Sequence, residues 1–258
     1  METVGHHGRR TTFELTDRGG DGAPLLFVHG SGSTHAVWSG QGRLADRRPV
    51  VALDLSGHGG SDDVSTAAGP ETLDAYADDV VAVARETGAR VVCGNSLGGA
   101  VALQVALERD LDLDALVLAG TGAKLGVLPD LLGWLGSDFD HAVSFLLGPN
   151  RLLATDDPRY LQVTESALRD VGQRVLERDF RTSNAFDVRE RLGEVDLPAL
   201  ALTGERDELT PPSYHEYLAD HLPQGRWRLV EGAAHLSMLE QPAAFNEAVA
   251  GFLADVGV

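Results

Sequence analysis

Short apolar runs, separated by turn-forming glycines and prolines, recur along the 258-residue chain. A short apolar run that ends at glycine or at a polar residue is typical of a strand buried on both faces. The segments that we predict to be β-strands are 11–15, 24–29, 49–54, 90–95, 115–119, 198–203 and 226–230. The chain therefore predicts a sheet as its core.

Helical periodicity fills most of the gaps between these strands. The apolar residues of 73–83 recur every three or four positions, which places them on one face of a helix. Residues 97–107 are apolar nearly all round and predict a buried helix, and 242–254 form an amphipathic helix that proline begins. Strands that alternate with helices predict an α/β fold, with a mostly parallel central sheet flanked by helices on both faces.

One segment, between about Gly122 and Gly193, lacks any run that predicts a strand. Its first half is apolar, and its second half is charged with helical spacing. We expect residues 1–121 and 193–258 to form the core, and residues 122–192 to form a helical cap (lid) inserted over the sheet. The alternative is that these helices only thicken the core.

Acidic residues outnumber basic ones by 39 to 21, which gives a formal net charge of −18. A surface of one negative sign repels phosphate groups, so we expect no nucleic-acid partner and no binding to anionic membranes. Lys124 is the only lysine, and the other basic residues are arginines. Such acidity suggests an acidic proteome adapted to concentrated salt, whereas a GC-rich genome would explain the arginines but not the charge.

Cys93 is the only cysteine, so we expect no internal disulfide and a cytoplasmic location. No apolar run reaches the length of a membrane span, and residues 1–10 lack the apolar core of a secretion signal. No dinucleotide-binding glycine motif, Walker lysine or His-Glu-x-x-His sequence occurs, so we expect no cofactor and no metal. We interpret the remaining polar pairs as solvated surface: His6-His7, Asp62-Asp63, Asp78-Asp79 and Asp156-Asp157.

The clearest chemical motif is the sequence Gly94-Asn95-Ser96-Leu97-Gly98, which lies between a predicted strand and the buried helix. A Gly-x-Ser-x-Gly sequence at a strand-to-helix turn pushes the serine hydroxyl outward, and its glycines permit close backbone contacts. The start of the following helix offers free N–H groups to a developing negative charge. The motif indicates that Ser96 is a nucleophile.

A nucleophilic serine needs a base, and the base needs an acid that orients it. His235 follows the last predicted strand, and Asp207 follows the strand 198–203. The carboxyl ends of parallel strands meet at one edge of a sheet, and Ser96 lies at that same edge. We therefore expect these three side chains to converge there, in the chain order serine, acid, histidine.

A glycine-rich turn, His29-Gly30-Ser31-Gly32, ends the strand 24–29. Such a turn can aim a backbone N–H at the carbonyl oxygen of a substrate. We expect the N–H groups of Ser31 and Leu97 to form an oxyanion hole.

Together these motifs resemble the α/β-hydrolase superfamily over essentially the whole chain. The matching pieces are His29-Gly30, the sequence 54–61, Gly94 to Gly98, Gly204 to Asp207 with Pro211, and His235. The resemblance implies an α/β-hydrolase fold in which Ser96 is the nucleophile, Asp207 the acid and His235 the base. Serine at position 96 disfavours the members that use an aspartate nucleophile, such as haloalkane dehalogenases and epoxide hydrolases. An asparagine before the serine, as Asn95 is here, resembles the corresponding turn of the meta-cleavage-product hydrolases, which cleave C–C bonds.

We therefore expect a carboxylesterase-like serine hydrolase that cleaves an ester or thioester of a small-to-medium hydrophobic substrate through an acyl-enzyme. The expected partner is a small-molecule ester. The residues that we expect to line an apolar pocket are Trp38, Trp134, Phe139, Phe145 and Leu146. A C–C bond hydrolase, a cofactor-free perhydrolase and a non-catalytic ligand receptor on the same fold stay open as alternatives, and so does the oligomeric state.

Overall fold

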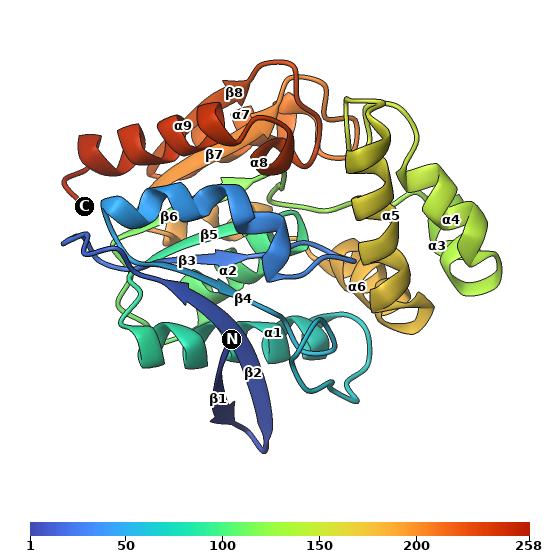
Figure 1. Ribbon diagram of the computed structural model, residues 1–258, viewed down its shortest axis with the longest axis horizontal. Coiled ribbons are helices and arrows are strands. Elements are labelled where there is room, and N and C mark those ends of the chain that lie inside the picture. The colour runs from blue at the N-terminus through green and yellow to red at the C-terminus, as the bar shows by residue number, and fades with distance from the viewer.

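The computed structural model describes residues 1–258 and contains one eight-stranded sheet between two layers of helices (Figure 1). The strand order is β1-β2-β4-β3-β5-β6-β7-β8, and only the pairs β1–β2 and β2–β4 are antiparallel. The strands are β1 (Glu2–His6), β2 (Arg9–Thr16), β3 (Leu25–Val28), β4 (Val50–Leu53), β5 (Val91–Asn95), β6 (Ala115–Ala119), β7 (Pro198–Gly204) and β8 (Gln224–Val230). The predicted fold class is confirmed.

The helices connect successive strands, as a mostly parallel sheet requires. The α-helices are α1 (Pro70–Thr87), α2 (Leu97–Glu108), α3 (Pro129–Ser137), α4 (Phe139–Leu146), α5 (Pro158–Val171), α6 (Gln173–Ala185), α7 (Pro212–His221), α8 (Ser237–Glu240) and α9 (Pro242–Asp255). Two 3-10 segments are η1 (His35–Asp46) and η2 (Arg189–Glu194). No helix combines the length and the apolar character that a bilayer crossing needs.

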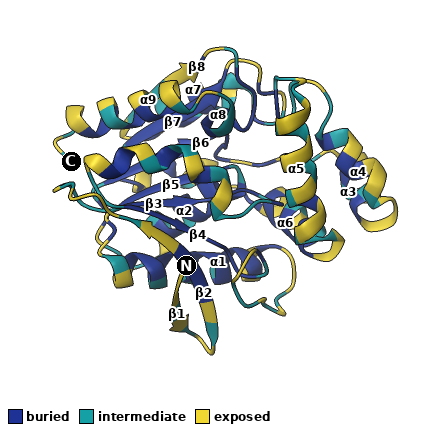
Figure 2. Cartoon of the chain, in the orientation of Figure 1, coloured by how far each residue is buried: buried dark blue, intermediate teal, exposed yellow.

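Alternate residues of the central strands pack into two separate cores, one on each face of the sheet. Leu26 and Val28 of β3 pack with α1 and α2, whereas Leu25 and Phe27 pack with η1 and α9. Figure 2 shows these strands buried throughout. Burial on both faces explains why the strands read as continuous apolar runs. Cys93 of β5 has no exposed surface, and burial raises the pKa of its thiol well above the usual value.

Helices α3 to α6 all lie between β6 and β7 in the chain, and Figure 1 shows them grouped beyond one end of the sheet. A single bridge, Lys124 with Asp187, closes the base of this segment. The Lys124 ammonium and the Asp187 carboxylate lie 3.3 Å apart across it. The chain thus leaves the sheet and returns to it through neighbouring points, which is the geometry of an inserted segment.

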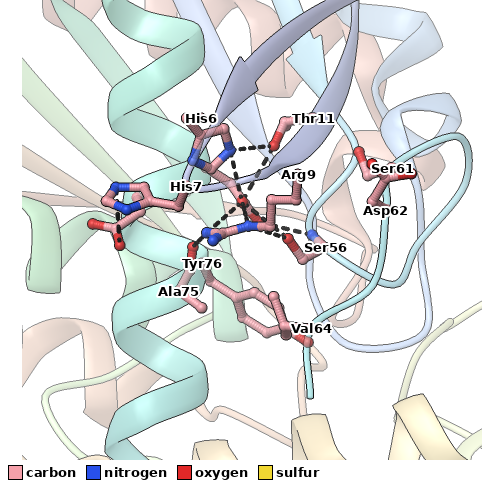
Figure 3. A network of polar contacts seen from close by, with 12 residues as sticks. His6, His7, Arg9, Thr11, Ser56, Ser61, Asp62, Val64, Ala75 and Tyr76 are labelled. Atoms are coloured by element: carbon pink, nitrogen blue, oxygen red, sulfur yellow. Dashed lines mark hydrogen bonds and ion pairs between the residues drawn. The ribbon is translucent and has the colours of Figure 1, made fainter. Parts of the chain in front are cut away.

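His6 and His7, expected to be solvated surface, lie where β1 turns into β2, and the two strands form an antiparallel hairpin. The hairpin is fastened to α1 by Arg9, whose guanidinium donates to Asp79 and Ser56, each at 3.1 Å (Figure 3). Asp79 also accepts from the hydroxyl of Thr11 and from Ser56, and it is fully buried. The expectation that Asp79 is a solvated surface residue is therefore wrong, because these three polar neighbours compensate its burial.

Candidate active site

Ser96 lies at the sharp turn between β5 and α2. Its backbone has φ 55° and ψ −119°, a conformation that non-glycine residues rarely adopt and that stores strain. The turn is held by close backbone packing, because a side chain at Gly94 would overlap the carbonyl of Gly98, and one at Gly98 would overlap the carbonyl of Val28. The Thr121 hydroxyl donates to the Ser96 carbonyl at 2.8 Å and braces the turn from β6.

Asp207 and His235 form a buried hydrogen-bonded pair next to this turn. Oδ2 of Asp207 lies 2.9 Å from Nδ1 of His235. The other carboxylate oxygen accepts two backbone N–H groups, those of Leu209 and Thr210, at 2.9 Å each. The Thr210 hydroxyl donates to Oδ2 of Asp207 at 2.8 Å and lies 3.2 Å from His235 Nδ1. Asp207 is thereby fixed from four directions.

The electrostatics of the pair favour a charged carboxylate and a defined imidazole tautomer. Burial alone would raise the pKa of Asp207, but His235 and the Thr210 donors hold that pKa below its usual value. An ionised Asp207 accepts a hydrogen bond from the Nδ1–H of His235, so Nε2 is the ring nitrogen that is left to accept a proton. Nε2 makes no hydrogen bond within the chain.

Ser96 and His235 line the same cavity, which has a volume of about 440 Å³. Ser96 Oγ and His235 Nε2 make no hydrogen bond to each other in this structure. Catalytic hydrogen bonds of this kind often tighten only when substrate is bound. The structure thus gathers the three predicted residues at one edge of the sheet, and of their mutual contacts only the Asp207–His235 hydrogen bond is formed.

The two N–H groups expected to form an oxyanion hole have no backbone acceptor. Neither Ser31 nor Leu97 donates a backbone hydrogen bond to the rest of the chain. Ser31 lines the cavity, whereas the Leu97 side chain is buried beneath the turn that carries Ser96. Two unused donors beside Ser96 could bind an oxyanion.

The expected pocket residues are mostly placed elsewhere, and only Phe145 of the five lines the cavity. Trp38 packs in the core between Phe27 and Phe245, at ring distances of 4.7 and 6.0 Å, and is 2% exposed. The expectation that Trp38, Trp134, Phe139 and Leu146 line the pocket is corrected accordingly.

The other three residues are held within the α3–α4 pair. Trp134 packs against His141 and Phe145, with ring centroids 4.2 and 5.3 Å away. Leu146 is fully buried, and Phe139 packs partly buried against the same core. The apolar faces of these helices pack against each other and the protein body, so Trp134, Phe139 and Leu146 do not line the cavity.

Sequence reasoning missed two polar residues that support the pair. Thr210 bridges Asp207 and His235, and the only signal for it was its position three residues after the acid. His215 of α7 is fully buried, and its Nε2 accepts the Thr121 N–H at 3.0 Å. No sequence pattern marked His215. It ties α7 to the strand end whose Thr121 hydroxyl braces Ser96.

We expect the protein to lose stability at acidic pH, because two of its buried histidines have lowered pKa values. Burial lowers the pKa of His215 to about 4 and that of His29 to about 4. Between pH 6.5 and 4 the unfolded chain binds these protons and the native protein does not, so the free energy of unfolding falls as pH falls. His58 opposes this trend, because Asp179 raises its pKa despite burial.

We expect the urea midpoint to drop between pH 7.5 and 5.0. His215→Gln keeps an acceptor for Thr121 but does not titrate, so its midpoint should drop less than that of the parent. Equal midpoints of the parent at both pH values would contradict this expectation.

A second buried network joins α6 to the core. The Asp179 carboxylate accepts from the Tyr76 hydroxyl at 2.6 Å and lies 2.9 Å from His58 Nε2. Arg178 donates to the Tyr76 hydroxyl at 3.0 Å and to Asp63 at 2.7 Å. Asp179 and His58 are at most 1% exposed. The network fastens the inserted helices to the loop that follows β4.

Comparison with known proteins places this chain in one family. The model of the alpha/beta hydrolase family matches residues 25–248, so the chain belongs to that family. The expectation of a hydrolytic, esterase-like enzyme is confirmed at the level of the family.

Individual relatives cover nearly the whole chain. It is 31% identical to a pimeloyl-[acyl-carrier protein] methyl ester esterase of Pectobacterium atrosepticum, over 91% of this chain and 95% of the relative. It is 27% identical to 3-oxoadipate enol-lactonase 2 of Acinetobacter baylyi, over 92% of this chain and 90% of that relative. Among solved structures, a thermophilic esterase superposes with a TM-score of 0.87 at 32% identity, covering 99% of this chain and 98% of the other.

Proposed function

We propose that this protein is a serine hydrolase that cleaves neutral carboxylic esters through a Ser96–His235–Asp207 triad and an acyl-enzyme. The observation that carries the proposal is the Asp207–His235 pair, at 2.9 Å, opening onto the cavity that Ser96 also lines. The names of the relatives, esterase and lactonase, describe hydrolysis of ester bonds and support the same reaction.

In the proposed mechanism His235 Nε2 takes the Ser96 proton as Oγ attacks the ester carbonyl carbon. The Ser31 and Leu97 N–H groups hold the oxyanion, and ionised Asp207 stabilises the imidazolium. The imidazolium then gives its proton to the departing alcohol, which leaves an ester between Ser96 and the acyl group. Water, deprotonated by His235, releases the acid and restores the serine.

The proposed substrate is uncharged, because much of the cavity wall is apolar and no cationic side chain lines it to pair with an anion. No lysine or arginine lines it, and Glu208 is its only carboxylate. Residues 122–192 supply much of the apolar wall, including Leu128, Leu131 and Phe145, so we propose that they act as a cap over the site. Burying an unpaired carboxylate against such a wall costs several kcal/mol.

A panel of p-nitrophenyl esters from C2 to C16 tests the function, together with a fluorophosphonate that labels nucleophilic serines. We expect hydrolysis to peak at short-to-medium chains, and the label to lie on Ser96 by peptide mass spectrometry. A label elsewhere would refute the triad. Cleavage of a dienone substrate but of no ester would favour a C–C hydrolase, and peroxide-dependent turnover a perhydrolase. Tight ligand binding without any product would favour a receptor.

A charged acyl chain should be a poor substrate. We expect p-nitrophenyl butyrate to have a kcat/KM at least 100-fold above that of p-nitrophenyl hemisuccinate, which differs by its terminal carboxylate. Glu208→Gln removes the one negative side chain of the cavity and should raise the hemisuccinate value several-fold. Glu205→Gln is the matched control, because Glu205 is exposed and lies outside the cavity lining. Equal rates on both esters would contradict the neutral-substrate assignment.

A further inference from the structure

The inserted helices present one unusual polar group in the cavity wall. Most of the wall from α5 and α6 is apolar, formed by Val163, Ala167, Leu168 and Phe180. Thr164 of α5 lies among these residues and also lines the cavity. It is 7% exposed, so its hydroxyl is almost entirely removed from solvent.

The Thr164 hydroxyl has no hydrogen-bond partner. A threonine inside a helix commonly bonds the carbonyl one turn earlier, but Thr164 does not do so. Leaving a buried hydroxyl unpaired costs free energy, and each such group in a native protein needs an explanation. Other buried threonine hydroxyls of this chain are paired, among them Thr11 with Asp79, Thr182 with the Gly69 N–H, and Thr210 with Asp207.

The position of this unpaired group distinguishes it from the others in the molecule. Five buried side-chain atoms lack a partner, those of His6, Trp38, Gln41, Thr164 and Arg178. Thr164 alone among these residues lines the cavity that holds Ser96. The unmet hydrogen bond therefore lies where a substrate would be.

We propose that the Thr164 hydroxyl recognises an uncharged oxygen of the substrate, remote from the bond that is cleaved. The inference rests on the proposed ester hydrolysis and makes the substrate class more specific: an ester whose chain carries an ether, keto or hydroxyl oxygen. A threonine in a helix populates two χ1 rotamers, so rotation can turn the hydroxyl from the wall toward the cavity. The oxygen is uncharged because no cation lines the cavity to pair with a charged one.

The geometry separates this contact from the reacting carbonyl. Leu168, one helical turn after Thr164, packs against Gly32 of the turn that follows β3. One turn of helix rises about 5.4 Å, so Thr164 lies a further turn along α5 from that contact. We therefore expect Thr164 to contact the substrate chain rather than the reacting carbonyl.

An oxygen scan of the acyl chain tests the proposal. The probes are p-nitrophenyl octanoate and its analogues in which an ether oxygen replaces one methylene in turn. We expect the parent enzyme to favour one oxygen position about tenfold in kcat/KM over its neighbours. Thr164→Val has nearly the same shape without the hydroxyl, and it should abolish this peak. Plain octanoate offers no chain oxygen to the hydroxyl, so the peak is measured as the ratio of each kcat/KM to that of octanoate in the same variant.

Two further variants complete the test. Ser166→Ala changes an exposed hydroxyl on the same helix and should keep the peak. Ser183 of α6 also lines the cavity, so loss of the peak in Ser183→Ala but not in Thr164→Val would overturn the assignment. A flat oxygen scan in an active enzyme would overturn the role of Thr164 alone. Failure of the parent to cleave any ester, octanoate included, would overturn the proposed function itself.

Discussion

Replacement of Ser96 by alanine should lower kcat by at least 10⁴-fold on any ester that the protein cleaves. The proposed mechanism forms the acyl-enzyme on this hydroxyl, and removing such a nucleophile abolishes covalent catalysis. Stability should change by less than about 1 kcal/mol, because alanine meets the same strain at φ 55°. Initial rates and urea unfolding of the same preparation measure both quantities.

Ser213→Ala is the control for this variant, since Ser213 is exposed on α7 and lies outside the cavity lining. It should retain the parent rate. Full activity of the Ser96 variant, or fluorophosphonate labelling that survives it, would refute the nucleophile.

Asp179→Ala should destabilise the protein by about 3–5 kcal/mol, which is the usual cost of breaking a buried charged network. The change leaves the Tyr76 hydroxyl and the His58 ring without their carboxylate partner in a region that water does not reach. Urea unfolding followed by tryptophan fluorescence measures the loss.

Asp170→Ala on α5 is the matched control, because Asp170 is exposed and makes no ion pair. Asp179→Asn should fall between the two, since its amide keeps hydrogen-bonding atoms but not the charge. An Asp179→Ala variant as stable as the control would show that the network contributes little.

The sequence predicted the sheet well because its strands are buried on both faces. Each predicted strand from 24–29 to 226–230 overlaps an observed one, and the ends differ by at most two residues. The strand β1 was missed because four of its five residues, for example Thr3 and Gly5, are polar or small and mostly exposed. An edge strand with so little buried surface carries no apolar pattern to detect.

The candidate triad could be predicted because topology alone brings strand ends together. Ser96, Asp207 and His235 each follow a strand of the parallel sheet, so their approach needs no knowledge of side-chain packing. The pocket wall was predicted poorly for the opposite reason. Whether Trp134 or Thr164 faces the cavity depends on how the inserted helices rotate and pack. A large aromatic side chain can either line a pocket or pack in a core, so the sequence does not distinguish the two.

The sequence also failed to reveal which charged side chains are buried. Asp79 and Asp179 lie in helices that carry other carboxylates, such as exposed Glu71 and half-buried Glu177, and nothing local in the sequence separates the buried ones from these neighbours. Their partners, Arg9 and Tyr76 among them, come from residues about 70 and 100 positions away in the chain. Pairing over such separations is visible only once the fold has been assembled.

Because of the position of Cys93, the folded protein does not react with thiol reagents. It is the only cysteine, and it lies in the central strand β5 without exposed surface. A cysteine introduced at an exposed position of α3–α6 would therefore take a maleimide fluorophore at that one site, with no background to remove. In the unaltered protein the Cys93 thiol reacts only when the centre of the sheet opens. The rate of its modification therefore measures the rate of global unfolding.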